Sequence, residues 1–271
     1  MKKILLFSLS FVALSAFAQE LKLETGKKIT STTTTSVNMD MGMGGKMTID
    51  GSTKSLIEIT GADAKNYNAK STTVKMTMSQ EGMGQKVNFD SDKKEDRETE
   101  VGKEMSKMLD VATSVTIDKN TGKVTEIDKK AIVSDDTNPM ASLMGNTNSA
   151  EASTAAAFLY IPNGKKVGDK WGDSVNESGM KGLKNFELKS IVDNVATVAI
   201  TTKSKGTISK EAQGMQFEIA MDGIGDGIIL VNTKTFLVKK STLNNDVNGT
   251  LDMMGQSLPI TIKSSATTIF E

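Results

Sequence analysis

Hydrophobic and polar residues alternate with a period of two along much of the chain, and this pattern predicts β-strands. In STTVKMTMSQ, residues 71–80, the apolar side chains of Val74, Met76 and Met78 fall on one face of the predicted strand. The hydroxyl and lysine side chains fall on the other face. Further alternating strands are expected at 55–60, 86–89, 195–202, 215–221 and 258–262.

Four methionines are concentrated in NMDMGMGGKM, residues 38–47. Met39, Met41 and Met43 have one parity, so a strand here would direct all three side chains to the same face. Met47 continues this parity beyond the two glycines.

Glycine-containing turns separate many of the predicted strands, among them EGMGQ at 81–85 and NTGK at 120–123. Short links of this kind join antiparallel strands, because a parallel pair needs a crossover of about a dozen residues. The sheets are therefore expected to be antiparallel.

One region near the middle of the first half has helical periodicity. Within residues 97–110, Val101, Met105, Met108 and Leu109 have the i, i+4, i+7, i+8 spacing of a single helix face.

A second helical region follows. Asn138 and Pro139 are favourable residues for the start of a helix. Another start is expected at Asn148, with Glu151 as its capping-box partner, and this helix should end before Pro162.

These patterns predict an α+β protein with mostly antiparallel, curved β-sheets and two or three short helices. Two strand–Asn-Thr–strand units, at 115–127 and 228–241, favour two related halves. The expected organisation is a signal peptide at 1–18, a first β-rich half with one helix at 19–135, a helical segment at 136–161 and a second β-rich half at 162–271.

The first residues predict export. Two lysines precede an apolar run at 4–17, and Ala16-Phe17-Ala18 has the small-x-small pattern of a signal-peptidase site. The run is shorter than the about 20 residues of a membrane-spanning helix, and no later stretch is apolar enough to span. We expect cleavage after Ala18 and a soluble protein that is periplasmic or secreted.

The chain has no cysteine and no histidine. The fold therefore lacks disulfides, and no lipid-bearing cysteine follows the signal peptide. Ordinary zinc sites and the Ser-His-Asp and Cys-His nucleophile systems are also excluded. With no motif for a catalytic carboxylate or Ser-Lys pair, we expect a protein that is not an enzyme and has no cofactor.

Charge and aromatic content narrow the partners. Acidic and basic residues balance at 33 each, and aromatic residues make up 4% of the chain. Because no basic stripe with interleaved aromatic residues occurs, nucleic acid is not expected as a partner. The core must come mainly from valine, isoleucine, leucine and methionine.

The 17 methionines leave three alternatives open. They can form plain core, they can line a surface for an apolar ligand or protein partner, because methionine is flexible and polarisable, or they can bind Cu(I). Residues two apart on a strand have Cα atoms about 6.8 Å apart, so several methionines must converge before a copper site exists. Shared parity with valine, isoleucine and phenylalanine favours burial or an apolar surface over a metal site. The residues expected to line a ligand-binding face are Met39, Met41, Met76, Met78, Phe217 and Met221.

Other motifs are explained better by structure than by function. Trp171 is expected to open a strand and pack over the core. DKNTG at 118–122 lacks the glutamate at the twelfth position of a calcium loop, so a turn is expected. DGIGDG at 222–227 lacks the lysine of a phosphate loop, so bends or bulges in a strand are expected. Asp135-Asp136 has none of the surroundings of a glycosidase carboxylate pair.

Several of these features together resemble a known family. An early threonine-rich strand, Met-Gly-Gln hairpins at 83–85 and 254–256, the NTG turn and KVGDKWGDS at 166–174 are similar to a domain-of-unknown-function family common among exported proteins of Bacteroidota. The resemblance implies no catalytic residues. The long curved strands with few helices also resemble, at the level of the fold, the half-barrels of periplasmic lipoprotein carriers.

The leading hypothesis is a binding module in which a concave sheet face accepts a lipid-like or other apolar ligand. One alternative is an envelope structural or interaction protein without a small ligand. The other is a methionine-rich Cu(I)-binding protein.

Overall fold

The computed structural model describes residues 21–42, 45–82, 84–127, 150–177, 180–212, 215–253 and 256–271. The predicted signal peptide, the predicted helix start at Asn138-Pro139 and the acidic pair Asp135-Asp136 lie outside these residues.

The described residues form one twelve-stranded sheet in which each pair of neighbouring strands is antiparallel. The strands of the first half are Lys28–Asp40 (β1), Lys46–Ala62 (β2), Asn66–Gly82 (β3), Gln85–Asp90 (β4), Ala112–Asp118 (β5) and Val124–Glu126 (β6). Those of the second half are Lys170–Glu177 (β7), Met180–Val192 (β8), Val195–Ala212 (β9), Met215–Asn232 (β10), Val238–Met253 (β11) and Gln256–Phe270 (β12). Their order across the sheet is β6-β5-β3-β2-β1-β12-β11-β10-β9-β8-β7, with β4 paired to β3.

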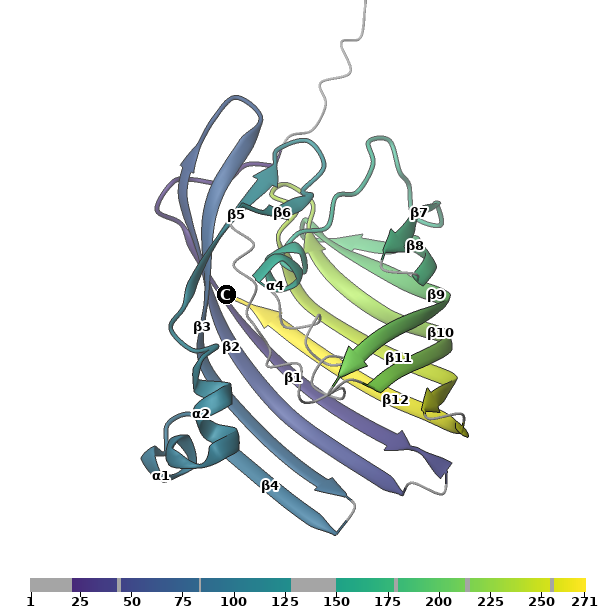
Figure 1. The fold of residues 1–271 in the computed structure, drawn as a ribbon. Coiled ribbons are helices and arrows are strands. Elements are labelled where there is room, and N and C mark those ends of the chain that lie inside the picture. Colours follow the sequence, from purple (N-terminus) through teal and green to yellow (C-terminus); the bar gives the residue numbers. More distant parts are fainter. Residues whose placement is uncertain are drawn as a thin grey trace, which may run out of the picture.

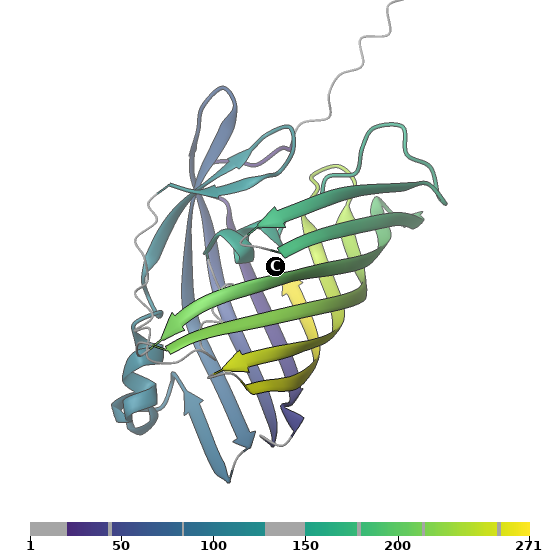
Figure 2. The ribbon, with the colours of Figure 1, turned by 45° about the vertical axis from the view of Figure 1, so that its right-hand side comes forward.

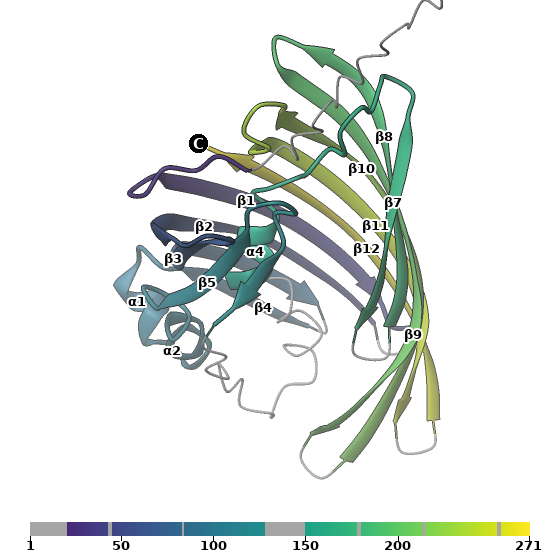
Figure 3. The same cartoon turned by 90° about the horizontal axis from the view of Figure 1, so that it is seen from above.

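The first and last strands pair in the middle of the sheet. Their register runs from Ser31 opposite Phe270 to Asp40 opposite Thr261. The sheet curves strongly around one concave face and does not close on itself (Figures 1, 2 and 3). The expected curved antiparallel structure is confirmed, and the strands of both halves belong to a single sheet.

Three short helices accompany the sheet in the described part of the chain: Lys94–Glu98 (α1), Glu100–Ser106 (α2) and Ala150–Ala155 (α4). Where one helix was expected at 97–110, the structure has two that meet at Thr99. The backbone of Thr99 is extended, and its hydroxyl accepts a hydrogen bond from the Gly102 amide at 2.9 Å, which caps α2. A Cβ atom at Gly102 would lie 1.8 Å from the Asp96 carbonyl oxygen, so this tight corner depends on glycine.

The last helix ends earlier than the sequence predicts. It stops at Ala155 rather than just before Pro162. Phe158 then forms an isolated β-bridge with Leu237, in the turn before β11, which commits the following segment to an extended backbone.

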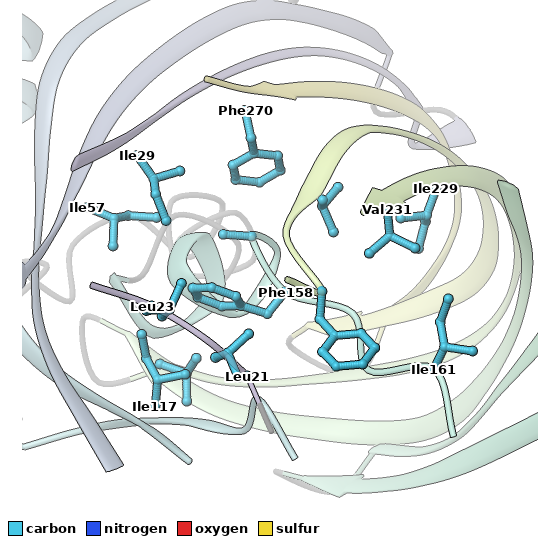
Figure 4. Packing of buried hydrophobic residues seen from close by; sticks show 14 of the residues in the cluster. Leu21, Leu23, Ile29, Ile57, Ile117, Phe158, Ile161, Ile229, Val231 and Phe270 are labelled. Carbon is cyan, nitrogen blue, oxygen red and sulfur yellow. The ribbon is translucent and has the colours of Figure 1, made fainter. Parts of the chain in front are cut away.

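The main hydrophobic core fills one end of the concave face. In Figure 4 the side chains of Ile29, Ile57 and Phe270 point from one wall toward Leu21 and Phe158 in the interior. The N-terminal segment is held there by Tyr67, whose hydroxyl donates to the Leu21 carbonyl at 3.0 Å and accepts from the Leu23 amide at 3.2 Å. This end of the concave face is therefore occupied by the protein's own side chains.

Trp171 and the DKNTG motif at 118–122, for which the sequence predicts structural roles, make structural contacts. Trp171 lies at the start of β7, packs against the main core and stacks on Phe186 with ring centroids 5.5 Å apart. The Asp118 carboxylate receives hydrogen bonds from the turn that ends at Gly122, where φ is 68°.

The glycine-rich motif at 222–227 lies inside β10 without interrupting the strand. Its glycines allow neighbouring strands to approach closely. A Cβ atom at Gly225 would lie 2.4 Å from Asn245 Oδ1, and one at Gly227 would lie 2.2 Å from the Thr242 carbonyl oxygen.

Candidate functional site

The strand register determines which residues lie on the concave face. Ile29, Ile57 and Phe270 belong to the interior core, and directly paired residues on neighbouring strands share a face. The odd-numbered residues of β1 and β2 and the even-numbered residues of β12 therefore face inward. The same pairing extends this face to β3, β11 and β10.

Met39 and Met41 lie in a hydrophobic cluster on this concave face. Met39 is opposite Met47 on one side and Ile262 on the other. The buried members of this methionine cluster are Met39, Met41, Met47, Ile49 and Ile260, and the partly buried side chains packed against them are Val37, Met78, Leu251 and Ile262.

Met76 lies in an adjacent cluster with Phe89 and Leu109, which Met105 and Met108 partly cover. Met78 contacts both clusters and therefore links them.

The two remaining predicted site residues come from β10. Met221 is half-buried and lies opposite Gly249, which is in turn opposite Ile260 of the methionine cluster. Phe217 is opposite Met253, and its side chain lies outside the described part of the structure. The structure thus brings Met39, Met41 and Met78 together, with Met76 and Met221 nearby.

Several members of this surface were missed by sequence reasoning, namely Met47, Ile49, Leu251, Ile260 and Ile262. The alternation of apolar and polar residues places each of them on the apolar face of its own strand. No local signal shows that β12 pairs with β1, so their proximity to Met39 could not be inferred.

The methionine cluster differs from the other two clusters in the elements that contribute its residues. The main core includes Ala157 and Phe158 from the segment after α4, and the Met76 cluster includes Met105 from α2. Among the described residues, the methionine cluster contains only residues of β1, β2, β3, β11 and β12 and of the turn after β1. Its five central members are 4–7% exposed, and only the side chains at its margin are partly exposed.

Charged residues are segregated between the two faces of the central sheet. On β1, β2, β3 and β12, and on residues 219–231 of β10 and 241–251 of β11, the described inward positions carry no charged side chain. Charged residues at outward positions of these strands include Lys28, Lys54, Asp222, Asp246 and Lys263. The concave face is thus uncharged over six adjacent strands.

The carboxylates whose pKa is lowered also lie away from the concave face. Hydrogen bonds from Thr121 lower the pKa of Asp118, and backbone hydrogen bonds from Lys65 and Asn66 lower the pKa of Asp63. Both carboxylates are in turns. An ion pair with Lys189 lowers the pKa of Glu187, which has outward parity in β8.

A hollow of about 380 Å³ is formed by β1, β10, β11 and β12. Most of its lining side chains have outward parity, including those of Asp226, Asp246 and Lys263. This hollow lies mainly on the charged face, away from the methionine cluster. Within the residues that the structure covers, no group of three or more carboxylates is placed to hold a metal ion.

The described residues form an open, curved antiparallel sheet whose concave face is uncharged over six adjacent strands. The chain belongs to a family of unknown function, DUF6263, whose model matches residues 64–238, from the start of the β3 region to the start of β11. The family membership expected from the sequence motifs is confirmed.

No curated protein matches this chain. Among solved structures, one described as lipid–protein interactions in lipovitellin has a TM-score of 0.50 and 10% sequence identity, over 92% of this chain and 25% of that chain. This chain thus spans a quarter of the lipovitellin chain, and the likeness concerns the fold alone.

Two further structures align with lower scores. OpdQ of Pseudomonas aeruginosa has a TM-score of 0.25 at 5% identity, over 92% of this chain and 99% of that chain. The translocator domain of the autotransporter NalP from Neisseria meningitidis has a TM-score of 0.24 at 7% identity, over 91% and 89%. No helix in the described part of this chain has the length and apolar character needed to cross a membrane.

Proposed function

We propose that this protein is an exported binding module that holds a lipid-like or other apolar ligand on the concave face of its sheet and catalyses no reaction. The observation that carries the proposal is the methionine cluster, an apolar cluster on the uncharged part of the concave face whose marginal side chains are partly exposed. The leader-like pattern of residues 1–18 supports export to the periplasm or beyond.

Methionine suits such a surface. Its unbranched side chain has three rotatable bonds and a polarisable sulfur, so a face of several methionines can repack around ligands of different shape. The partly buried side chains of Val37, Met78, Leu251 and Ile262 at the margin of the cluster would make the first contacts with a ligand.

The fold-level likeness to lipovitellin supports the same proposal. That structure is described by its lipid–protein interactions, and a quarter of its chain aligns with 92% of this chain. The support is limited to architecture, since the identity is 10%.

The first experiment is a native mass spectrum of residues 19–271 purified gently from a periplasmic preparation. A heterogeneous adduct of lipid mass is expected. A clean apo mass, together with no uptake of the neutral dye N-phenylnaphthylamine, would contradict the proposal and favour a structural or interaction protein with a packed core.

A matched pair of variants localises the binding. Met78→Gln places an amide at the margin of the methionine cluster and should weaken dye binding by about tenfold, because the amide loses hydration without gaining a partner. Ile224→Gln, at an exposed outward position of β10, should leave dye binding unchanged.

One observation favours a second function. Met39, Met41 and Met47 are buried in a single cluster, and thioethers are soft ligands that suit Cu(I). Stoichiometric copper in the same mass spectrum, lost in a Met39→Leu variant, would support this function instead.

A further inference from the structure

A band of hydroxyl side chains crosses the concave face between the main core and the methionine cluster. Thr33 in β1 is opposite Thr53 in β2 on one side and Thr268 in β12 on the other. The band consists of Ser31, Thr33, Thr35, Thr53, Ser55, Ser264 and Thr268, all at inward positions of β1, β2 and β12.

Some hydroxyls of this band form hydrogen bonds to other side chains of the protein. The Thr33 and Thr268 hydroxyls are 3.0 Å apart and share a hydrogen bond, and those of Ser55 and Thr73 are 3.5 Å apart. These pairs hold the strands together on the side toward the main core.

The hydroxyls of Thr35 and Thr53 are different. Both residues are half-buried, and neither hydroxyl has a hydrogen bond to another residue that the structure describes. Thr35 is two residues from Val37, which packs against the methionine cluster, and its partner Gly51 is also opposite Met78. Two uncommitted hydroxyls therefore border the apolar surface.

We propose that the ligand is an uncharged amphiphile, whose hydroxyl-bearing head group bonds to Thr35 and Thr53 and whose apolar tail lies along the methionine cluster. This inference rests on the proposed function and adds the polarity and the direction of the ligand. From Thr35 to Met39 is four residues, about 13 Å along the strand, so a tail of dodecyl length matches the apolar surface.

The absence of charge at the described inward positions of the six central strands selects against ionic head groups. A carboxylate or ammonium that leaves water needs an opposite charge or several hydrogen bonds to offset its desolvation. The inward positions of the six central strands offer only hydroxyl, amide and apolar side chains. A neutral polyol head group needs only hydrogen bonds, which these hydroxyls can both donate and accept.

Three probes with tails of similar length test this inference: glycerol monolaurate, laurate above its pKa and dodecyltrimethylammonium. Each is used below its micelle concentration to displace N-phenylnaphthylamine from residues 19–271. Glycerol monolaurate should bind at least about tenfold more tightly than either ionic probe. If laurate or the ammonium probe binds as tightly, the inference is overturned while the proposed function stands, and if neither the dye nor any probe binds, the proposed function has failed.

Variants at Thr35 and Thr34 locate the head group. Thr35→Val keeps the shape and removes the hydroxyl, so affinity for glycerol monolaurate should fall about three- to tenfold. Thr35→Lys places a cation on the concave face and should shift preference toward laurate. Thr34→Lys places the same charge on the exposed outer face of the same strand and should leave the preference unchanged. Equal behaviour of the two lysine variants, or full affinity of Thr35→Val, would contradict the placement.

Discussion

Asp118 shows how a single side chain fixes a turn in this protein. Its Oδ1 accepts hydrogen bonds from the Asn120 amide at 3.0 Å, from the Thr121 amide at 2.8 Å and from the Thr121 hydroxyl at 2.8 Å. These bonds stabilise the carboxylate and lower its pKa below the ordinary value of 3.8. Because the pKa in the folded state is below that in the unfolded state, the contribution to stability is present above pH 3.8 and is lost as the pH falls through the folded pKa.

Replacing this carboxylate should therefore have a pH-dependent effect. At neutral pH, Asp118→Ala should lower the free energy of unfolding by about 1 kcal/mol, a value that allows for the solvent exposure of the turn. This loss should lower the melting temperature by about 2–4 °C. The difference from the wild type should narrow when melting is measured below pH 3.8. Asp50→Ala, at an exposed outward position of β2, is the control and should match the wild type at both pH values.

Gly227 is required by the close approach of β10 and β11. A Cβ atom there would lie 2.2 Å from the Thr242 carbonyl oxygen, which is backbone and cannot rotate away. Gly227→Ala should lower the free energy of unfolding by about 1–3 kcal/mol in urea titrations. Gly61→Ala, where the nearest atom is 3.9 Å away, should have a much smaller effect, and equal stability of the two variants would show that the strands can move apart.

At the scale of elements, the corner between α1 and α2 is followed by a short helix that ends at Ser106, and this end separates Val101 from Leu109, which the sequence places on one helix stripe. Leu109 is 6% exposed and packs with Met76 and Phe89, whereas Val101 is 40% exposed. Leu109→Ala should lower the free energy of unfolding by about 2–4 kcal/mol, because it leaves a cavity. Val101→Ala should change the free energy of unfolding by no more than about 0.5 kcal/mol. Comparable losses in chemical denaturation would support a helix that continues from Val101 through Leu109 instead.

The same corner shows what the sequence could and could not predict. Alternation located the strands, because inward and outward positions differ in polarity along each of them. It also placed Met39, Met41, Met76 and Met78 on one face. The break between the two helices at Thr99 depends on the close approach of Gly102 to Asp96, which the spacing of apolar residues does not reveal.

At the scale of the whole molecule, the sheet is continuous only through the pairing of β1 with β12. This pairing joins residues from opposite ends of the chain, so no local pattern could predict it. It also explains why the candidate surface was only half identified, since Ile260 and Ile262 reach Met39 and Met47 through it.

Removal of β12 should therefore have a larger effect than any substitution. A chain ending at residue 253 leaves β1 and β11 as open edges in the middle of the sheet, and it should lose cooperative unfolding and aggregate. Size-exclusion chromatography and circular dichroism would check this. A synthetic peptide of residues 254–271 added during refolding should restore part of the monomeric protein, and a well-folded truncated chain would contradict the central role of β12.

The position of β12 also has a consequence for the order of events in the cell. The strand that completes the centre of the sheet is the last to be synthesised, about 230 residues after the end of β1. At about 5–20 residues per second, the inner edge of β1 stays unpaired for tens of seconds after its own synthesis. During this interval its free backbone groups and the methionines beside them can pair with another chain. Production of this protein should thus depend on a holding chaperone that releases the chain only after β12 has emerged.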